Sequence, residues 1–247
     1  MKGKTSIITG AGSGIGAAIA KLFAEQGMNV VVSDIDLKSA NKITKQITNK
    51  GGKAIALEAD ISKPAECEYL VKETLKKYKR LDVAVNNAGI GGAQKPVGEY
   101  PIDEWQKVIE INLSGVFYGM HYQIPAMLKN KGGAIINMAS ILGQVGAVNS
   151  SGYVAAKHGV VGLTQNAALE YAKKKIRVNA VGPGYIKTPL LTDNLEKEQL
   201  DAIKELHPIG RLGKPQEVAE LVLWLASEKA SFVTGAYYNI DGGYLAR

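Results

Sequence analysis

The segment SGYVAAK, residues 151–157, places a tyrosine and a lysine four positions apart among small residues that favour a helix. Side chains at positions i and i+4 of a helix lie one above the other, so the Lys157 ammonium can approach the Tyr153 hydroxyl. A nearby cation lowers the pKa of a phenol, about 10 in water, by about one to three units. The pair could therefore exchange a proton with a substrate. The same spacing also occurs on solvated helices, where the lysine stem merely covers the ring.

The chain around this pair alternates short apolar runs with longer helical patterns. Seven candidate strands emerge: TSIIT, NVVVSD, KAIALEAD, LDVAVNNAG, GAIINMAS, IRVNAVGPG and AYYNIDGG. Candidate helices cover residues 14–26, 37–49, 63–78, 103–129, 152–173 and 215–227. Runs that are apolar on both faces are typical of a parallel sheet buried between two helical layers. The pattern predicts an α/β fold with a three-layer, doubly wound, seven-stranded parallel sheet, the Rossmann fold.

No linker rich in proline, serine or charge divides the 247 residues, so a single domain over residues 1–247 is expected. The longest connection without a strand lies between Pro183 and Lys214. Its segment LLTDNLEKEQLDAIKEL has a helical pattern. We therefore expect residues 183–214 to form a flap over the substrate.

The composition excludes several classes of protein. No apolar run is long enough to cross a bilayer, and MKGKTSIITG at the N-terminus lacks the pattern of a signal peptide, so a cytoplasmic location is expected. Cys67 cannot form an internal disulfide, and the three scattered histidines lack metal-ligand spacing, so no metal is predicted. The net charge of +7 comes from lysines on expected helix surfaces, so neither nucleic acid nor a membrane is predicted as a partner.

Directly after the first strand, TGAGSGIG leads without a break into the helical AAIAKLFAEQG. Glycines at this place permit a tight turn and a close approach of the backbone to a pyrophosphate, and the helix N-terminus attracts negative charge. The loop fits the pattern T-G-x-x-x-G-x-G through Thr9, Gly10, Gly14 and Gly16. A dinucleotide site is therefore predicted.

Asp34 ends the second strand eighteen residues beyond Gly16, near the spacing at which an acid accepts hydrogen bonds from the adenosine ribose. A 2′-phosphate would face its carboxylate, and Ser13 in the glycine loop supplies no positive charge. We therefore predict NAD (NADH) as the cofactor rather than NADP, although Lys38 lies nearby. The alternative role for an acid here is to cap the helix that starts at Leu37, which suits Asp36 better than Asp34.

With these residues in place, the chain resembles the short-chain dehydrogenase/reductase family over essentially its whole length. The resemblance is carried by TGAGSGIG, NNAG at residues 86–89, a serine after the fifth strand, Tyr-x-x-x-Lys, PG at 183–184 and DGG at 241–243. It implies a catalytic tetrad of Asn112, Ser140, Tyr153 and Lys157. Tyr153 would exchange the substrate proton, Lys157 would make the phenol more acidic and bind the nicotinamide ribose, and Ser140 would donate to the substrate oxygen. Asn112 would hold a water next to Lys157.

The resemblance also implies which residues hold the cofactor. Asp60 would contact adenine, Asn87 would support the cofactor strand, and Ile186 and Thr188 would hold the carboxamide and the pyrophosphate. The full expected set is Gly10, Ser13, Gly14, Ile15, Gly16, Asp34, Asp60, Ile61, Asn87, Ala88, Gly89, Tyr153, Lys157, Pro183, Gly184, Ile186 and Thr188.

The substrate pocket is expected to be lined by residues 90–101, residues 141–152 and the flap, which are mostly apolar or small. The side chains expected to face the substrate are Ser140, Leu142, Gln144, Tyr153 and Tyr185. Gln144 could bind a second hydroxyl or carbonyl, or it could simply face solvent. A small or medium secondary alcohol or ketone is predicted, such as a hydroxyketone, a cyclic alcohol or a sugar.

Two other functions stay open. A 3-oxoacyl-[acyl-carrier-protein] reductase is one, because the basic surface could receive an acidic carrier, although IGGAQKP follows NNAG where such reductases often carry Thr-Arg-Asp. A non-catalytic NAD(H)-sensing module is the other, and the complete tetrad speaks against it. The resemblance further implies a homotetramer built on the helices at 103–129 and 152–173, where the apolar stripe VFYGMHYQIPAML suits an interface or a core.

Overall fold

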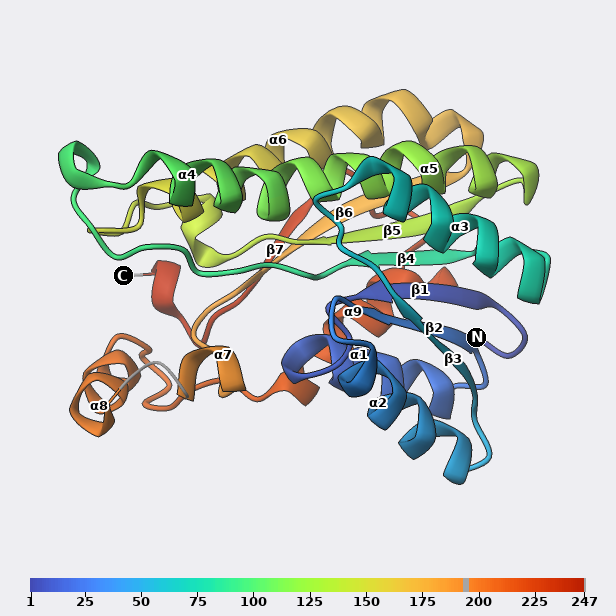
Figure 1. The fold of residues 1–247 in the computed structure, drawn as a ribbon, viewed down its shortest axis with the longest axis horizontal. Coiled ribbons are helices and arrows are strands. Elements are labelled where there is room, and N and C mark those ends of the chain that lie inside the picture. Colours follow the sequence, from blue (N-terminus) through green and yellow to red (C-terminus); the bar gives the residue numbers. More distant parts are fainter. Residues whose placement is uncertain (193–195, 247) are drawn as a thin grey trace.

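The computed structural model describes residues 1–192 and 196–246, and the sheet in this part of the chain is parallel and lies between two layers of helices (Figure 1). Its seven strands are β1 (Thr5–Thr9), β2 (Asn29–Asp34), β3 (Lys53–Glu58), β4 (Val83–Asn86), β5 (Gly133–Met138), β6 (Ile176–Pro183) and β7 (Tyr237–Ile240). The order across the sheet is β3-β2-β1-β4-β5-β6-β7, so the winding reverses between β1 and β4. The predicted doubly wound α/β fold is confirmed, and a crevice is expected at the carboxyl ends of β1 and β4.

The two faces of the sheet are covered by different helices (Figure 1). One layer contains α1 (Gly14–Glu25), α2 (Leu37–Asn49) and α9 (Pro215–Ala226). The other contains α3 (Pro64–Tyr78), α4 (Ile102–Ile109), α5 (Gly115–Lys129) and α6 (Ser151–Tyr171). Apolar side chains at helical spacing face the sheet, as with Ile19 and Phe23 of α1, both fully buried. No helix among the described residues has the length and apolar character needed to span a membrane.

The segment predicted as one helix over residues 103–129 is helical throughout, but its winding changes midway. Between α4 and α5 lies a five-residue π-helical stretch, Glu110–Ser114. Such stretches are rare and often mark functional sites. This one coincides with Asn112, which is fully buried and whose side chain binds the backbone of Ile90 outside the helix. These two hydrogen bonds stabilise the π-helical turn, which is wider than a turn of α-helix.

The segment expected to form a flap, residues 183–214, contains α7 (Pro189–Thr192) and α8 (Lys197–Glu205), which lie apart from the two helical layers (Figure 1). Residues 193–195 of this segment lie outside the described residues. The buried His207 joins the segment to the end of β6, because its Nε2 accepts from the Tyr185 N–H at 3.2 Å. Its Nδ1 lies 3.0 Å from the Ile203 carbonyl oxygen, so that nitrogen carries the proton.

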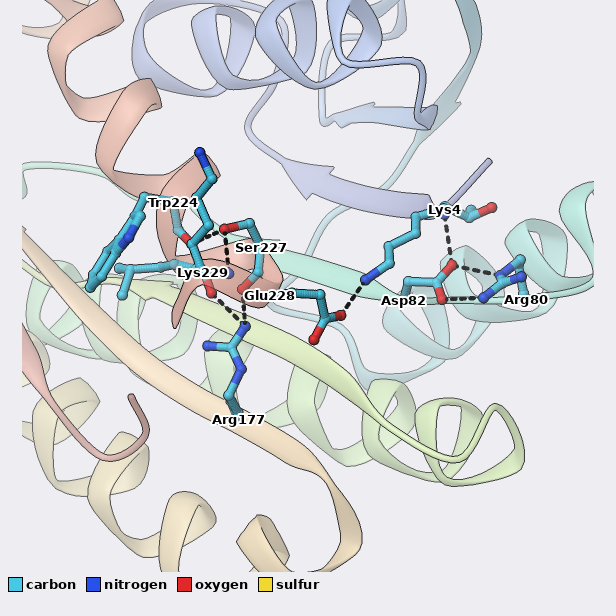
Figure 2. A network of polar contacts seen from close by, with 10 residues as sticks. Lys4, Arg80, Asp82, Arg177, Trp224, Ser227, Glu228 and Lys229 are labelled. Atoms are coloured by element: carbon cyan, nitrogen blue, oxygen red, sulfur yellow. Dashed lines mark hydrogen bonds and ion pairs between the residues drawn. The ribbon is translucent and has the colours of Figure 1, made fainter. Parts of the chain in front are cut away.

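Polar contacts join neighbouring elements at the amino ends of the strands (Figure 2). Asp82, which is 8% exposed, accepts from the Thr5 N–H at 2.8 Å and binds the Arg80 guanidinium at 2.6 and 2.7 Å. Lys4 forms a nearby ion pair of 2.7 Å with Glu228, whose side chain is 85% exposed. The two carboxylates are thus close in space but differ in burial.

Replacing Asp82 with Ala should lower the free energy of unfolding by about 2–3 kcal/mol, because the buried Thr5 N–H loses its acceptor and Arg80 loses its partner. Replacing Glu228 with Ala should cost less than about 1 kcal/mol, since its ion pair is in water. Urea denaturation of both variants measures the difference. Equal losses would contradict the assignment of Asp82 as the link between β1 and β4.

Candidate active site

Ser140, Tyr153 and Lys157 meet beside the carboxyl end of β5. Ser140 directly follows Ala139 and caps a short 3-10 turn at Ile141–Gly143, where its Oγ accepts from the Leu142 N–H at 3.2 Å. Tyr153 lies in the first turn of α6, near enough to Ser140 for that side chain to lower the pKa of the phenol. The structure therefore brings together a hydroxyl, a phenol and an amine in the order that the resemblance implies.

Lys157 lies one turn after Tyr153 and is 3% exposed. Its Nζ is 5.4 Å from the centroid of the Tyr153 ring and donates to the Met138 carbonyl at 2.8 Å. Burial lowers the pKa of the Lys157 ammonium to about 8. The cation thus lies under the ring of the phenol and is held by the last residue of β5.

The pKa of Tyr153 is raised in this structure, chiefly because burial disfavours the phenolate. The hydrogen bond with Ser140 acts in the opposite direction, and the neighbouring Tyr185 raises the pKa further. The effect of Lys157 on the acidity of the Tyr153 phenol remains a prediction; in this structure the ammonium donates to the Met138 carbonyl, and burial has the largest effect on the pKa of Tyr153. Tyr153 is therefore a protonated donor at neutral pH.

Asn112 holds the loop that follows β4. Its Oδ1 accepts from the Ile90 N–H at 2.8 Å, and its Nδ2 donates to the Ile90 carbonyl at 2.8 Å. A Cβ on Gly89, one residue earlier, would lie 3.0 Å from Asn112 Oδ1 and 3.7 Å from Lys157 Nζ. The side chain of Asn112 is thus used to place this loop next to Lys157, and the expected water remains a prediction.

The glycines of the loop between β1 and α1 stand where a side chain would be strained or would collide. Gly10 and Gly14 have positive φ values of 62° and 53°, and a Cβ on Gly16 would lie 2.3 Å from the Gly10 carbonyl oxygen. Asn87 Nδ2 donates to the carbonyls of Thr9 and Gly10 at 2.9 and 3.1 Å. The loop is therefore shaped by β4 as well as by its own glycines.

The helix that this loop opens fits an anion. The N-cap residue Ser13 is exposed and makes no side-chain cap hydrogen bond, and no acidic residue lies in the first turn of α1. The first N–H groups of the helix and the positive end of its dipole are therefore available to a pyrophosphate. Ile15 packs partly buried on the core beneath them. The residues present fit the dinucleotide predicted here.

Asp34 lies at the end of β2 beside the glycine loop. Its Oδ2 accepts from the Gly12 N–H at 2.8 Å, and its Oδ1 accepts from the Asp36 N–H at 3.1 Å. The carboxylate is thereby aimed at the loop, where an adenosine ribose is expected. Asp36 caps α2 by accepting from the Lys38 N–H at 2.9 Å, so the capping role lies with Asp36, as the sequence favours.

Asp60 and Ile61, expected next to the adenine, follow β3. Asp60 Oδ1 accepts from the backbone and the hydroxyl of Ser62 at 3.0 and 2.6 Å, just before α3. Burial acts to raise the pKa of Asp60, but the hydrogen bonds from Ser62 and Lys63 lower it overall. Ile61 is buried against the start of α5, where a Cβ on Gly115 would touch its Cδ1 at 2.5 Å. Asp60 thus has a structural role as the cap of a turn, and its contact with adenine remains a prediction.

The remaining predicted cofactor residues lie on both sides of the glycine loop. The Ala88 N–H donates to Thr9 Oγ1 at 3.2 Å, which ties the end of β4 to β1. A Cβ on Gly14 would lie 3.2 Å from Thr188 Cγ2, so the chain after β6 passes over the loop. The chain from the end of β6 to Thr188 contains the other predicted residues. These are Pro183, which ends β6, Gly184 and the buried Ile186. The structure gathers these residues at one edge of the sheet.

The remaining predicted substrate residues differ in their exposure to solvent. Leu142 is buried next to Ser140, whereas Gln144 is exposed, in keeping with the alternative of a solvent-facing side chain. Tyr185 is half-buried, with ring centroids 5.8 Å from His207 and 6.1 Å from Tyr244. The two partners of Tyr185 carry no motif in the sequence. They are found only because the fold brings the segment after α8 and the C-terminal segment to the end of β6.

The comparisons with known proteins span nearly the whole chain. A family model described as Enoyl-(Acyl carrier protein) reductase matches residues 10–245. The chain is 52% identical to cyclohexanol dehydrogenase of Acinetobacter sp. (strain SE19), over 99% of this chain and 96% of that protein. It is 42% identical to cis-4-hydroxycyclohexanecarboxylate dehydrogenase of Sinomonas cyclohexanicum, over 98% and 97%. The crystal structure of levodione reductase superposes with a TM-score of 0.96 at 35% identity, over 100% and 99% of the two chains.

Proposed function

Because the chain belongs to the short-chain dehydrogenase/reductase family, we propose that it oxidises cyclic secondary alcohols, and reduces the matching ketones, with a preference for NAD(H). The family uses NAD(P). The two relatives of this chain named above are, by their names, dehydrogenases that act on alcohol groups. The observation that carries the proposal is the meeting of Ser140, Tyr153 and Lys157 at the sheet edge that also holds the glycine loop.

When bound, the nicotinamide cofactor supplies the hydride chemistry. The chain's own residues handle the proton and hold the oxygen. In ketone reduction the Tyr153 hydroxyl gives its proton to the substrate oxygen, while Ser140 Oγ hydrogen-bonds to that oxygen as negative charge develops on it. Lys157 supplies positive charge under the phenol ring. In alcohol oxidation the proton moves from the alcohol to the Tyr153 phenolate, so this direction should speed up as pH rises toward the raised pKa of Tyr153.

The preference for NAD rests on the Asp34 carboxylate, which faces the glycine loop. Replacing Asp34 with Asn keeps an acceptor for the Gly12 N–H but removes the charge that repels a 2′-phosphate. We expect wild-type kcat/KM to favour NAD over NADP by at least about tenfold, and the variant to lose about tenfold of this ratio. Steady-state kinetics with both cofactors measure it.

Asp36 provides the matched control, since its carboxylate caps α2 two residues away. The Asp36→Asn variant should keep the wild-type ratio of the two cofactors. A ratio that changes equally in both variants would remove Asp34 from cofactor selection.

Two observations support a cyclic substrate. The two relatives named above act, by their names, on cyclohexanol and on a hydroxycyclohexanecarboxylate. In this chain we infer that the buried Leu142 and the rings of Tyr185 and Tyr244, whose centroids are 6.1 Å apart, form apolar walls of the substrate site. Such walls suit a six-membered carbon ring better than a sugar, whose hydroxyls need polar partners.

The test is a panel of substrates with NAD or NADP: cyclohexanol and cyclohexanone, a linear secondary alcohol, glucose, and a 3-oxoacyl thioester. The highest kcat/KM is expected for the cyclohexanol and cyclohexanone pair. A preference for the thioester would instead support the acyl-carrier-protein reductase. NADH binding without turnover of any substrate would support a sensing module.

We also propose that the protein is a homotetramer. This is supported by exposed apolar side chains on the outer faces of α5 and α6, namely Phe117, Leu128 and Leu169. Light scattering coupled to size-exclusion chromatography should give about four times the chain mass of 26.3 kDa. A monomer would contradict the proposal.

A further inference from the structure

Tyr237 lies on β7, which is separated from β5 by β6, and yet its side chain reaches the catalytic end of β5. Its Oη donates to the Ser140 carbonyl at 2.6 Å. The strand order is β5-β6-β7, so the phenol crosses over β6 to make this contact. A side chain on an outer strand therefore touches the backbone of the serine that we place at the substrate oxygen.

Gly182 of β6 makes the crossing possible. A Cβ at this position would lie 1.8 Å from Tyr237 Oη and 2.2 Å from its Cζ, so every other residue would collide with the ring. A glycine inside a strand often marks such a close approach. The phenol of Tyr237 can therefore reach Ser140 only because residue 182 is a glycine.

The Ser140 carbonyl is held from two directions. Besides Tyr237, it accepts from the Gly143 N–H at 2.8 Å, which closes the short turn after β5. This turn packs tightly on α6, because a Cβ on Gly143 would lie 2.9 Å from the Lys157 carbonyl oxygen. A shift of the turn would therefore change where Ser140 Oγ lies relative to Tyr153, which is on the same helix as Lys157.

The Tyr237 hydroxyl is suited to act as a constant donor. Burial raises its pKa, and the charges of Asp241 and Tyr153 act in the same direction. It therefore stays protonated over the working range of the protein. The Ser140 carbonyl keeps this hydrogen bond at each pH at which the fold is stable.

We propose that Tyr237 is a positioning residue for the reaction, which sets the place of Ser140 through its carbonyl. This inference rests on the proposed function of Ser140. The residue does not touch the reacting atoms; it acts by fixing the turn that carries the Ser140 hydroxyl.

The experiment replaces Tyr237 with Phe, which keeps the ring over Gly182 and removes the hydroxyl alone. We expect kcat for ketone reduction to fall about tenfold, with the dissociation constant of NADH unchanged within about twofold. In a Ser140→Ala background the same replacement should have no further effect on kcat, whereas general damage to the structure would lower it again. Tyr238→Phe is the matched control, since that ring packs on Trp224 at 5.8 Å and should leave kcat unchanged.

Hydrogen exchange of residues 139–145 supplies a readout that needs no substrate. Tyr237→Phe should exchange this segment several-fold faster than wild type or Tyr238→Phe, because the Ser140 carbonyl has lost one of its two donors. Unchanged exchange, or a kcat equal to that of wild type, would overturn the inference. A wild-type protein that turns over no substrate would contradict the proposed function instead, and the exchange data alone would then decide whether Tyr237 holds the turn.

Discussion

Replacement of Tyr153 with Phe is expected to lower kcat by about 10²- to 10⁴-fold while the affinity for NADH changes by less than about twofold. The Phe ring keeps the packing over Lys157, whose Nζ lies 5.4 Å from the ring centroid, and removes only the hydroxyl. The decrease in kcat measures how much proton transfer between Tyr153 and the substrate oxygen contributes to the rate. Steady-state turnover of cyclohexanone, with NADH titrated by fluorescence, gives both quantities.

A second tyrosine–lysine pair at the far end of α6 offers a control with a similar contact. Lys174, in the 3-10 turn that follows α6, lies 5.0 Å over the ring of Tyr171, the last residue of the helix. Tyr171→Phe should keep wild-type kcat, because a tyrosine–lysine pair has chemistry only where a substrate and cofactor can reach it. A wild-type kcat for Tyr153→Phe, or equal losses in both variants, would remove Tyr153 from the mechanism.

Replacement of Lys157 with Met should lower kcat by about 10²- to 10³-fold, because the positive charge under the Tyr153 ring is lost. The exposed Lys174 serves as the control, and Lys174→Met should turn over at the wild-type rate. Activity that survives in Lys157→Met would contradict a role for this ammonium in the proton exchange.

Lys157 should also make the free energy of unfolding depend on pH, because its pKa is about 8 in the folded protein and 10.5 for a free lysine. Below pH 8 both the folded and the unfolded chain carry the proton, and the folded state bears the full cost of a buried cation. Between pH 8 and 10.5 only the unfolded chain binds it, so stability gains about 1.4 kcal/mol per pH unit. From pH 7 to 9.5 the wild type should therefore gain about 2 kcal/mol relative to Lys157→Met.

Urea denaturation of the two proteins at both pH values tests this slope, which is independent of turnover. A difference in stability that stays constant with pH would mean that Lys157 is not held as a buried cation. The comparison also separates the effect of Lys157 on stability from its effect on turnover. The burial that costs stability at neutral pH also strengthens the electrostatic effect of the ammonium on the site.

The fold could be predicted from the sequence because its signals are local. Apolar runs, the glycine loop and Asp36 at the cap of α2 each act within a few residues, and the structure has the strands where the runs lie. The π-helical stretch at residues 110–114 could not be predicted in this way. It depends on hydrogen bonds between Asn112 and Ile90, which are 22 residues apart.

The site was predictable in its residues but less so in its electrostatics. Spacing places Tyr153 and Lys157 on one helical face, but it does not say which acceptor the ammonium chooses. In this structure the ammonium donates to the Met138 carbonyl, 19 residues away, and burial has the largest effect on the pKa of Tyr153. Tyr237 could not be connected with Ser140 either, because the contact requires the order of three strands, although Gly182 inside a strand was a usable signal.

The contacts of Asp82 and of Arg177, which donates to the last carbonyls of α9, lie at the amino ends of the strands (Figure 2). The proposed chemistry lies at the opposite ends. A library that randomises residues 90–101 and 144–149 would therefore leave the anchors of the framework intact. Such a scaffold can acquire a new substrate by evolution in its loops while its resistance to unfolding stays nearly constant.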